Sequence, residues 1–141
     1  MSNEARLNSM LQIRIGELSY QSIPASFNAD VSKANGPTPG AVTVSVNGAD
    51  INLSQLTAMG GFCRMMNLDA VNLVMAGIRD TITGVFYPLI DLKPGESYIV
   101  RLSHDLKKQE AGTGTFSGAT AALHAKAVGA PCVCLFECFD P

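Results

Sequence analysis

The chain has 141 residues and a net charge of −2, from ten basic and twelve acidic side chains. This length suits one domain with a hydrophobic core of its own, and the lack of a basic surplus argues against nucleic-acid binding. Only 16% of the residues are charged, against about 25% in an ordinary soluble domain, and the mean hydropathy is +0.19, so we expect copies of the chain or a partner to cover part of its surface.

The N-terminal region shows strand patterning after a polar start. Residues 1–9 are unpatterned and predict an extended arm, followed by a single domain over residues 10–141. Apolar residues then alternate with polar ones over residues 11–15, 18–22 and 27–31, the period of half-buried strands. Gln12 and Arg14 interrupt any signal-peptide core, and the apolar runs fall far short of the about 18 residues of a membrane span. We therefore expect no signal peptide and no membrane partner.

The clearest local signal is the pair Asn47-Gly48, the favoured centre of a two-residue type I′ hairpin. Residues 33–40 before it are almost all turn formers and predict a loop. The hairpin register puts apolar pairs on one face and polar pairs on the other: Val46 with Ala49, Val44 with Ile51, Val42 with Leu53, Ser45 with Asp50 and Thr43 with Asn52. Turn chemistry and hydrophobic pattern agree, so the sequence predicts a hairpin over residues 41–53.

Further apolar runs predict strands over residues 62–66, 71–78, 85–92, 98–102, 123–128 and 132–139. Pro88 lacks an N–H group, so its strand lies at an edge or carries a bulge. Pro94 and Gly95 suit the centre of a type II turn. Residues 104–118 predict an exposed loop, and residues 119–127 could form two helical turns, although we favour a strand. About eight to ten short strands predict an all-β fold, an antiparallel β-sandwich or jelly-roll-like barrel.

The four cysteines, at positions 63, 132, 134 and 138, form a poor disulfide framework because three of them crowd the last ten residues. Cys132, Cys134 and Cys138 share one face of a strand, where neighbours lie near the limit for bridging. We expect buried, reduced thiols and hence intracellular synthesis. We also expect five aromatic residues to lie in the core rather than at an interface: Phe86, Tyr87, Tyr98, Phe136 and Phe139.

Candidate chemistry in the sequence has ordinary explanations. Cys132, Cys134 and Cys138 with His124 could form a zinc site, but one intervening residue departs from the usual ligand spacing. Cys63 could pair with His104 or His124 as a catalytic dyad, a combination that any chain with these residue types offers. Ser103-His104-Asp105 has the letters of a hydrolase triad, but adjacent residues cannot form that geometry. We therefore expect no enzyme, cofactor or metal.

Other candidate sites are equally weak. Gly112-Thr113-Gly114 and Gly118 match no phosphate-binding motif. The acidic residues each fall at an expected turn, where Asp caps the backbone: Asp50, Asp69, Asp80 and Asp91. A calcium site would need several of these to converge. Lys107-Lys108 is too small a basic patch for nucleic acid.

Residues 60–69, 86–97 and Arg101-Leu102 carry a resemblance to a known class of protein. The stretch GGFCRMMNLD is followed by FYPLIDLKPGES and then RL. In this pattern an NLD turn leads to a strand, and a hairpin around KPGE ends in RL; a strand like residues 123–127 and a C-terminal hydrophobic strand follow. The pattern, over about residues 60–139, resembles small β-rich virion proteins of tailed bacteriophages.

The resemblance implies a capsid decoration (cement) protein that clamps the major capsid protein lattice from outside, after synthesis in the host cytoplasm. Such a protein would associate as a dimer or trimer, and we expect its contacts in the arm and in the loops over residues 33–40 and 107–118. The candidate contact residues are Asn3, Glu4, Arg6, Lys33, Asn35, Pro37, Lys107, Lys108 and Thr113.

Two alternatives remain open. A tail-associated subunit of the tube, adaptor or fibre type would need ring-forming edge strands and a long hairpin, and the hairpin predicted at Asn47-Gly48 is short for that. A carbohydrate-binding β-sandwich would present aromatic platforms, but the chain has no Trp and only three Tyr residues.

Overall fold

A computed structural model of the chain describes residues 5–29, 31, 35–107 and 120–141. Every regular element in these ranges is a β-strand, so the predicted all-β class is confirmed. The chain divides into two compact units, Met1–Ser32 and Lys33–Pro141. We expected the division after residue 9, but Ala5–Ser9 form a strand, β1, that belongs to the first unit.

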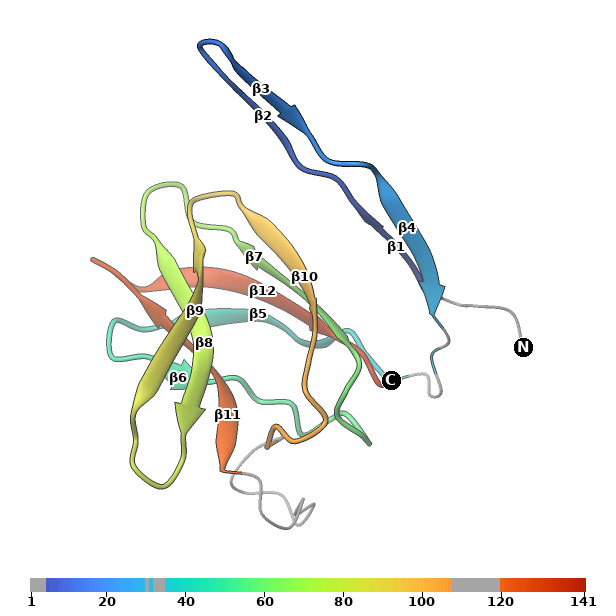
Figure 1. Cartoon of the computed structure of the whole chain (residues 1–141). Coiled ribbons are helices and arrows are strands. Elements are labelled where there is room, and N and C mark those ends of the chain that lie inside the picture. The colour runs from blue at the N-terminus through green and yellow to red at the C-terminus, as the bar shows by residue number, and fades with distance from the viewer. Residues whose placement is uncertain (1–4, 30, 32–34, 108–119) are drawn as a thin grey trace. The chain divides into compact units, whose positions relative to one another are not determined.

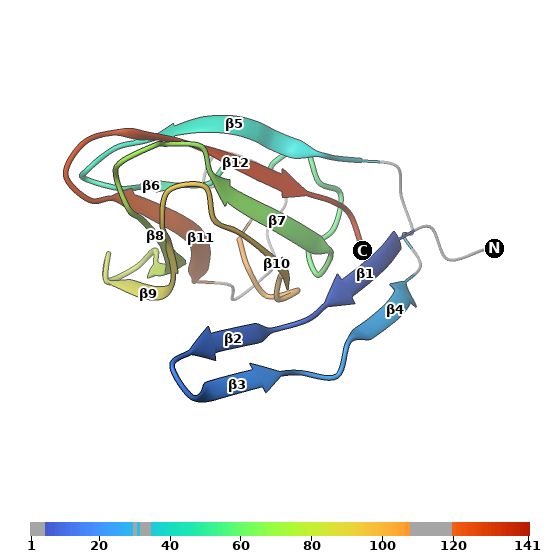
Figure 2. The ribbon, with the colours of Figure 1, turned by 90° about the horizontal axis from the view of Figure 1, so that it is seen from above.

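The second unit is a sandwich of two four-stranded antiparallel sheets, whose layers are seen in Figures 1 and 2. The first sheet has the order β10 (Ser97–Arg101), β7 (Phe62–Asn67), β12 (Cys132–Cys138) and β5 (Thr38–Val44). The second has the order β6 (Ala49–Asp50), β11 (Ala121–Ala127), β8 (Val74–Asp80) and β9 (Phe86–Leu92). If the strands β5 to β12 of this unit are numbered 1 to 8, the first sheet, read from β5, has the order 1-8-3-6 and the second has the order 2-7-4-5. This is the jelly-roll arrangement. The preference for a strand near the C-terminus is confirmed by β11.

The hydrophobic core lies between the two sheets, because successive side chains of a strand point to opposite faces. Strand β12 shows the alternation directly, with Cys132, Cys134, Phe136 and Cys138 buried. The second sheet contributes Val74, Ala76, Leu123 and Ala125 to the same core. Of the aromatic residues expected there, Phe136 is fully buried and Phe86 is half-buried. The prediction is wrong for Tyr87, Tyr98 and Phe139, which are exposed because they lie on edge strands or beyond a strand end.

The hairpin predicted over residues 41–53 is wrong. Strand β5 pairs with β12 and strand β6 with β11, so the two segments lie in opposite sheets. The turn between them is closed by Gly48 N donating to Ser45 O at 3.1 Å. A type I′ turn would need a positive φ at Asn47, and no non-glycine residue of the described chain has one. Val44, Ile51 and Leu53 still reach the core, because an arch between sheets turns the same face inward as a hairpin would, whereas Val46 at the turn is exposed.

The turn at residues 93–96 is also an arch between sheets. Gly95 has a φ of +78°, and Glu96 N donates to Lys93 O at 3.0 Å, as a type II turn requires. Strands β9 and β10 on its two sides belong to different sheets, so the hairpin expected here is wrong. The fully buried Asn67 fastens this arch, since its side-chain amide donates to Leu92 O at 2.9 Å and to Asn72 O at 2.8 Å.

Both structural expectations for Pro88 are confirmed, because β9 is an edge strand and carries a bulge. Ala76 faces Ile90 whereas Gly77 faces Pro88, which leaves Leu89 as the extra residue. A Cβ atom on Gly77 would collide with the facing backbone of β9, so the close approach at the bulge requires glycine.

Two of the four cysteines form a disulfide. Cys63 in β7 and Cys138 in β12 face each other across the sheet and are bonded. The prediction of reduced thiols is therefore wrong for this pair, since strand pairing brings together residues that sequence spacing keeps far apart. Cys132 and Cys134 are free and buried, as predicted.

The first unit is a long two-stranded hairpin, called the ribbon from here on and defined by residues 5–29 (Figure 1). Strands β2 (Gln12–Ile15) and β3 (Leu18–Gln21) form its tip. Strand β1 pairs with β4 (Ala25–Ala29) at its base. The predicted strands are confirmed, but the expectation that residues 11–15 are half-buried is wrong, because all of β2 is exposed.

A bulge joins the two parts of the ribbon. Leu11 and Ser22 are bonded through Ser22 N to Leu11 O at 2.8 Å, so the ladder continues past the tip. Below this pair, Met10 on one side opposes both Ile23 and Pro24 on the other. Proline has no N–H group to contribute to the ladder, and a bulge is one of the places where it is tolerated.

Candidate functional site

The ribbon has one mainly apolar face and one mainly polar face, although Ser9 and Ser22 lie on the first and Met10 lies on the second. Directly opposed residues of an antiparallel pair lie on the same face. On one face lie the pairs Leu7–Phe27, Ile13–Tyr20 and Ile15–Leu18, together with Leu11. On the other lie the pairs Arg6–Asn28, Asn8–Ser26, Gln12–Gln21 and Arg14–Ser19. The extra residue of the bulge places Phe27 on the same face as Leu18 and Tyr20. Without it, Phe27 would point to the polar face.

The apolar face of the ribbon is open to solvent. Ile15 is 71% exposed, Leu18 55% and Phe27 54%, and Leu11, Ile13 and Tyr20 are also exposed. An isolated two-stranded hairpin is at best marginally stable in water, since it has no second layer on which to bury a face. Contiguous exposed apolar surface of this kind marks an interaction site. The apolar face of the ribbon is therefore the first candidate functional surface.

The second candidate surface is a pocket of about 270 Å³ in the sandwich, here called the inter-sheet pocket. Its lining is apolar except for Arg101 and Ser103, and comes from both sheets and from the segment after β10: Met65, Val100, Ala76, Gly77, Ile78, Ile90, Leu123, Leu89, Leu102 and Leu106. Leu89, the extra residue of the β9 bulge, lines this pocket and is 69% exposed. The pocket therefore opens to solvent between the edge strands β9 and β10.

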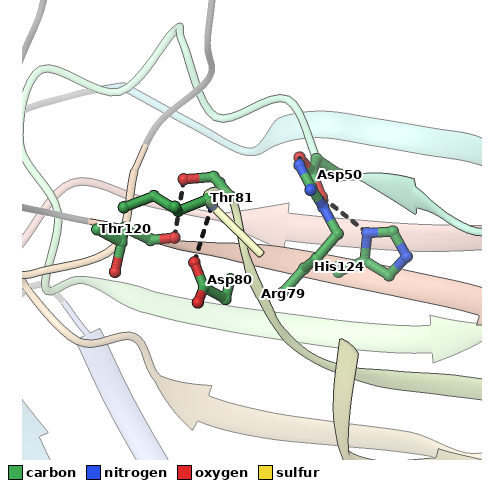
Figure 3. A network of polar contacts seen from close by, with 7 residues as sticks. Asp50, Arg79, Asp80, Thr81, Thr120 and His124 are labelled. Atoms are coloured by element: carbon green, nitrogen blue, oxygen red, sulfur yellow. Dashed lines mark hydrogen bonds and ion pairs between the residues drawn. The ribbon is translucent and has the colours of Figure 1, made fainter. Parts of the chain in front are cut away.

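A polar network on the second sheet contains the sandwich's buried histidine (Figure 3). Asp50 accepts from Arg79 Nε at 2.8 Å and lies 2.7 Å from His124 Nδ1. The Arg79 hydrogen bond lowers the pKa of Asp50, burial raises it and the bond with His124 lowers it again, so the pKa lies below its ordinary value. Phe86 covers the His124 ring, with centroids 4.8 Å apart. Because these residues come from β6, β11 and β8, the network ties the two-residue strand β6 to its sheet.

Of the four acidic residues expected at turns, two cap a turn and two do not. Asp69 and Asp80 do cap turns: Asp69 Oδ1 accepts from Asn72 N at 2.6 Å, and Asp80 Oδ1 accepts from Ile82 N at 2.8 Å. Both bonds lower the pKa of the carboxyl group that accepts them. The turn assignment is wrong for Asp50, which joins the polar network, and for Asp91, which lies within β9.

A buried carboxylate that sequence reasoning missed lies near the C-terminal end of the described chain. Asp140 is 1% exposed and accepts from Thr57 N at 2.8 Å, Ala58 N at 3.0 Å and Thr57 Oγ1 at 3.0 Å. Burial raises its pKa, but the hydrogen bonds from Ala58 and Thr57 outweigh burial and hold the pKa below its ordinary value. Asp140 thus fastens the segment between β6 and β7.

The contact residues predicted from the sequence are divided between the two units. Arg6 lies on the polar face of the ribbon, and Asn35 accepts from Asp140 N through its carbonyl oxygen at 3.2 Å. Pro37 is exposed just before β5, and Lys107 forms a bridge with Ala122. The loop expected over residues 33–40 is wrong for its last part, because Thr38–Gly40 pair with β12. The remaining candidates lie outside the described residues: Asn3, Glu4, Lys33, Lys108 and Thr113.

The candidate catalytic and metal-binding combinations are not assembled. Cys63 is bonded to Cys138 and so offers no free thiol, and Cys132 and Cys134 lie in the sheet opposite His124. His104 and Asp105 form an exposed pair at 3.3 Å. Across residues 5–29, 31, 35–107 and 120–141, no three His, Cys, Asp or Glu side chains gather as metal ligands. The same ranges contain no helix long and apolar enough to cross a membrane.

The apolar face of the ribbon is the feature that sequence reasoning missed as a site. Its signal was present in the alternation of Leu11, Ile13, Ile15, Leu18 and Tyr20, which indicates an apolar face but not what covers it. Comparison of the chain with models of protein families, with curated proteins and with solved structures found no match.

Proposed function

We propose that this chain is a non-enzymatic structural protein of a bacteriophage virion that decorates the outer capsid lattice and stabilises it. One observation carries the proposal: a ribbon with a mainly apolar face whose large side chains are exposed in the single chain. A face of this kind suits a subunit that completes its burial only when it is assembled with other proteins. The low fraction of charged residues points the same way.

Two further arguments support a capsid rather than another assembly. Jelly rolls occur in viral capsid proteins, which is an argument by fold analogy only. The turn pattern over residues 60–102 resembles virion proteins of tailed phages. A protein that binds only the assembled lattice stabilises it by mass action, by about 2.7 kcal/mol per site when its free concentration is a hundred times Kd.

A tail-associated subunit is the second candidate function. A tail tube needs a long hairpin. The ribbon is such a hairpin, whereas the segment around Asn47-Gly48 forms none. The two candidates place the protein on different parts of the same virion, so one experiment separates them.

The test uses the purified full-length chain, labelled with gold, and virions of the phage that encodes it, imaged by electron microscopy. Decoration predicts label over the head surface, and binding to emptied capsids that saturates at a fixed ratio to the major capsid protein. Label on the tail would replace decoration by the tail-associated function. Label on neither part would contradict both.

A matched pair of variants tests the role of the ribbon. In Ile15→Asn/Leu18→Asn a cross-strand pair of the apolar face becomes polar, and we expect capsid binding at least about tenfold weaker. Ile82→Asn/Val71→Asn is the control, since these sandwich residues are 78% and 80% exposed. Equal loss in both variants would remove the ribbon from the proposal.

A further inference from the structure

We propose that the inter-sheet pocket of one copy receives apolar side chains from the ribbon of a second copy, so that the chain assembles head to tail. The inference rests on the proposed function only in treating the apolar face of the ribbon as an association surface. The partner of that surface is the sandwich of a neighbouring copy.

The chemistry of the pocket selects an apolar occupant. Of its polar lining residues, Arg101 is committed to other contacts: Nη1 donates to Gly60 O at 2.9 Å, and the guanidinium lies 4.1 Å from the centre of the Phe62 ring. A polar or charged ligand would lose its hydration there without finding partners. An apolar cavity of about 150 Å³ accepts a benzene-sized group. The inter-sheet pocket, at about 270 Å³, has room for the ends of two aliphatic or aromatic side chains.

The ribbon carries side chains of that kind in sufficient number. Six large apolar residues of its face are exposed: Leu11, Ile13, Ile15, Leu18, Tyr20 and Phe27. At about 100 Å² for each half-exposed side chain, they offer on the order of 600 Å². Each partner in a standard-sized protein interface contributes about 800 Å². The apolar face of the ribbon, with its flanks, therefore approaches the area that a stable association needs.

The bulge in β9 determines how the ribbon would dock. A regular edge strand could extend its sheet by pairing with a ribbon strand. At β9 the missing N–H group of Pro88 and the extra residue Leu89 interrupt the ladder. Docking at this edge therefore proceeds by insertion of side chains rather than by strand addition. A contact between two different surfaces is heterologous, and it generates a closed ring or an open chain of copies.

The experiment measures molar mass by light scattering after size exclusion, over a range of concentrations of the full-length chain. The wild type should form oligomers. The ribbon variant Ile15→Asn/Leu18→Asn should be monomeric, and so should a pocket variant, Leu89→Asn. Ser103→Tyr, which fills the pocket from an exposed position, provides a second pocket variant. Ile82→Asn/Val71→Asn should assemble like the wild type.

Mixing the variants gives the decisive readout. The ribbon variant still has an intact pocket, and the pocket variant still has an intact ribbon. An equimolar mixture of the two should therefore form a one-to-one dimer through that one contact. A mixture that stays monomeric would overturn the inference, and so would pocket variants that assemble like the wild type. A wild-type chain that is monomeric at all concentrations would overturn it too. That last result would leave the gold-labelling experiment to decide the proposed function separately.

Discussion

The ribbon and the sandwich are built from the same kind of sequence, strands in which apolar and polar residues alternate, yet they differ in what covers the apolar face. In the sandwich, the inner faces of two sheets cover each other, and Leu53 is fully buried. In the ribbon, Leu18 occupies an equally apolar position and is 55% exposed. The difference shows that alternation identifies a surface to be covered, whereas the covering partner depends on a second layer.

The two regions also differ in how they treat polar groups. The sandwich contains buried polar side chains with partners, among them Asn67, His124 and Asp140. The described residues of the ribbon contain none that is buried. Buried polar networks fix one arrangement of a core, because each donor and acceptor must find its partner. The arrangement of the sandwich is therefore fixed by buried side-chain contacts within one chain, whereas the described part of the ribbon is specified chiefly by its backbone pairing.

The largest contrast should come from truncating the same residue type in the two regions. Leu53→Ala should lower the free energy of unfolding by about 2–5 kcal/mol, because it leaves a cavity in the core. Leu18→Ala should change it by no more than about 0.5 kcal/mol at concentrations where the chain is monomeric. Urea unfolding of both variants checks this. Equal losses would mean that the ribbon is already covered within one chain.

The buried carboxylate of Asp140 should be the next most sensitive position. Asp140→Ala leaves Thr57 and Ala58 without their acceptor and should cost about 2–3 kcal/mol at neutral pH. Asp91→Ala, at an exposed position in β9, is the control and should cost little.

The cost of Asp140→Ala should also depend on pH. The folded-state pKa of Asp140 is depressed, so its stabilisation is fully present above the unfolded-state pKa of about 3.9 and is lost as the pH falls through the folded-state value. The difference in unfolding free energy between wild type and variant should therefore shrink below about pH 4. A difference that stays constant down to the acid transition would contradict the assignment.

A smaller effect is expected at the edge of the second sheet. Asp50→Asn removes the charge that Arg79 and His124 share and should cost about 1–2 kcal/mol. Hydrogen exchange should quicken at Ala49 and Ile51, because β6 is held to β11 by few other contacts. Asp105→Asn, in an exposed pair, should leave both quantities unchanged.

The smallest expected effect concerns the reactivity of the cysteine thiols. Burial raises the pKa of Cys134 to about 11 and also raises that of Cys132. A thiol reagent at pH 8 should therefore react with neither cysteine in the folded protein, and with two per chain after unfolding without reductant. Reduction should raise the count to four. Four reactive thiols without reductant would show that Cys63 and Cys138 are not bonded in the protein as prepared.

Much of the fold could be predicted from local patterns, and the failures share one cause. Local patterns predict the strands around Asn47-Gly48 and around Pro94-Gly95 and the positions of both turns, although the type I′ conformation predicted at Asn47-Gly48 is wrong. Both were assigned to hairpins, because a tight turn between two amphipathic segments has the same local signal whether it joins neighbours in one sheet or crosses to the other. Pro88 was assigned correctly to an edge strand and a bulge, because a missing N–H group constrains pairing wherever the partner lies.

The candidate site divides in the same way. The alternation in residues 11–22 was evident in the sequence, but we expected those strands to be half-buried. Strands β2 and β3 are exposed because they form a two-stranded sheet with no second layer over it. Local alternation does not reveal whether a second layer is present. The inter-sheet pocket has no local signal at all, since its lining comes from both sheets and the segment after β10.

The sequence by itself determined that this protein belongs to the all-β class, that most of its strands alternate apolar and polar residues, and where most turns fall. These properties follow from the period of side-chain alternation and from the restricted dihedral angles of Gly and Pro. Only the tertiary structure decided which strands share a sheet, that Cys63 meets Cys138, and that the ribbon's apolar face is left open. Those outcomes depend on pairing between residues far apart in the chain, which local composition does not encode.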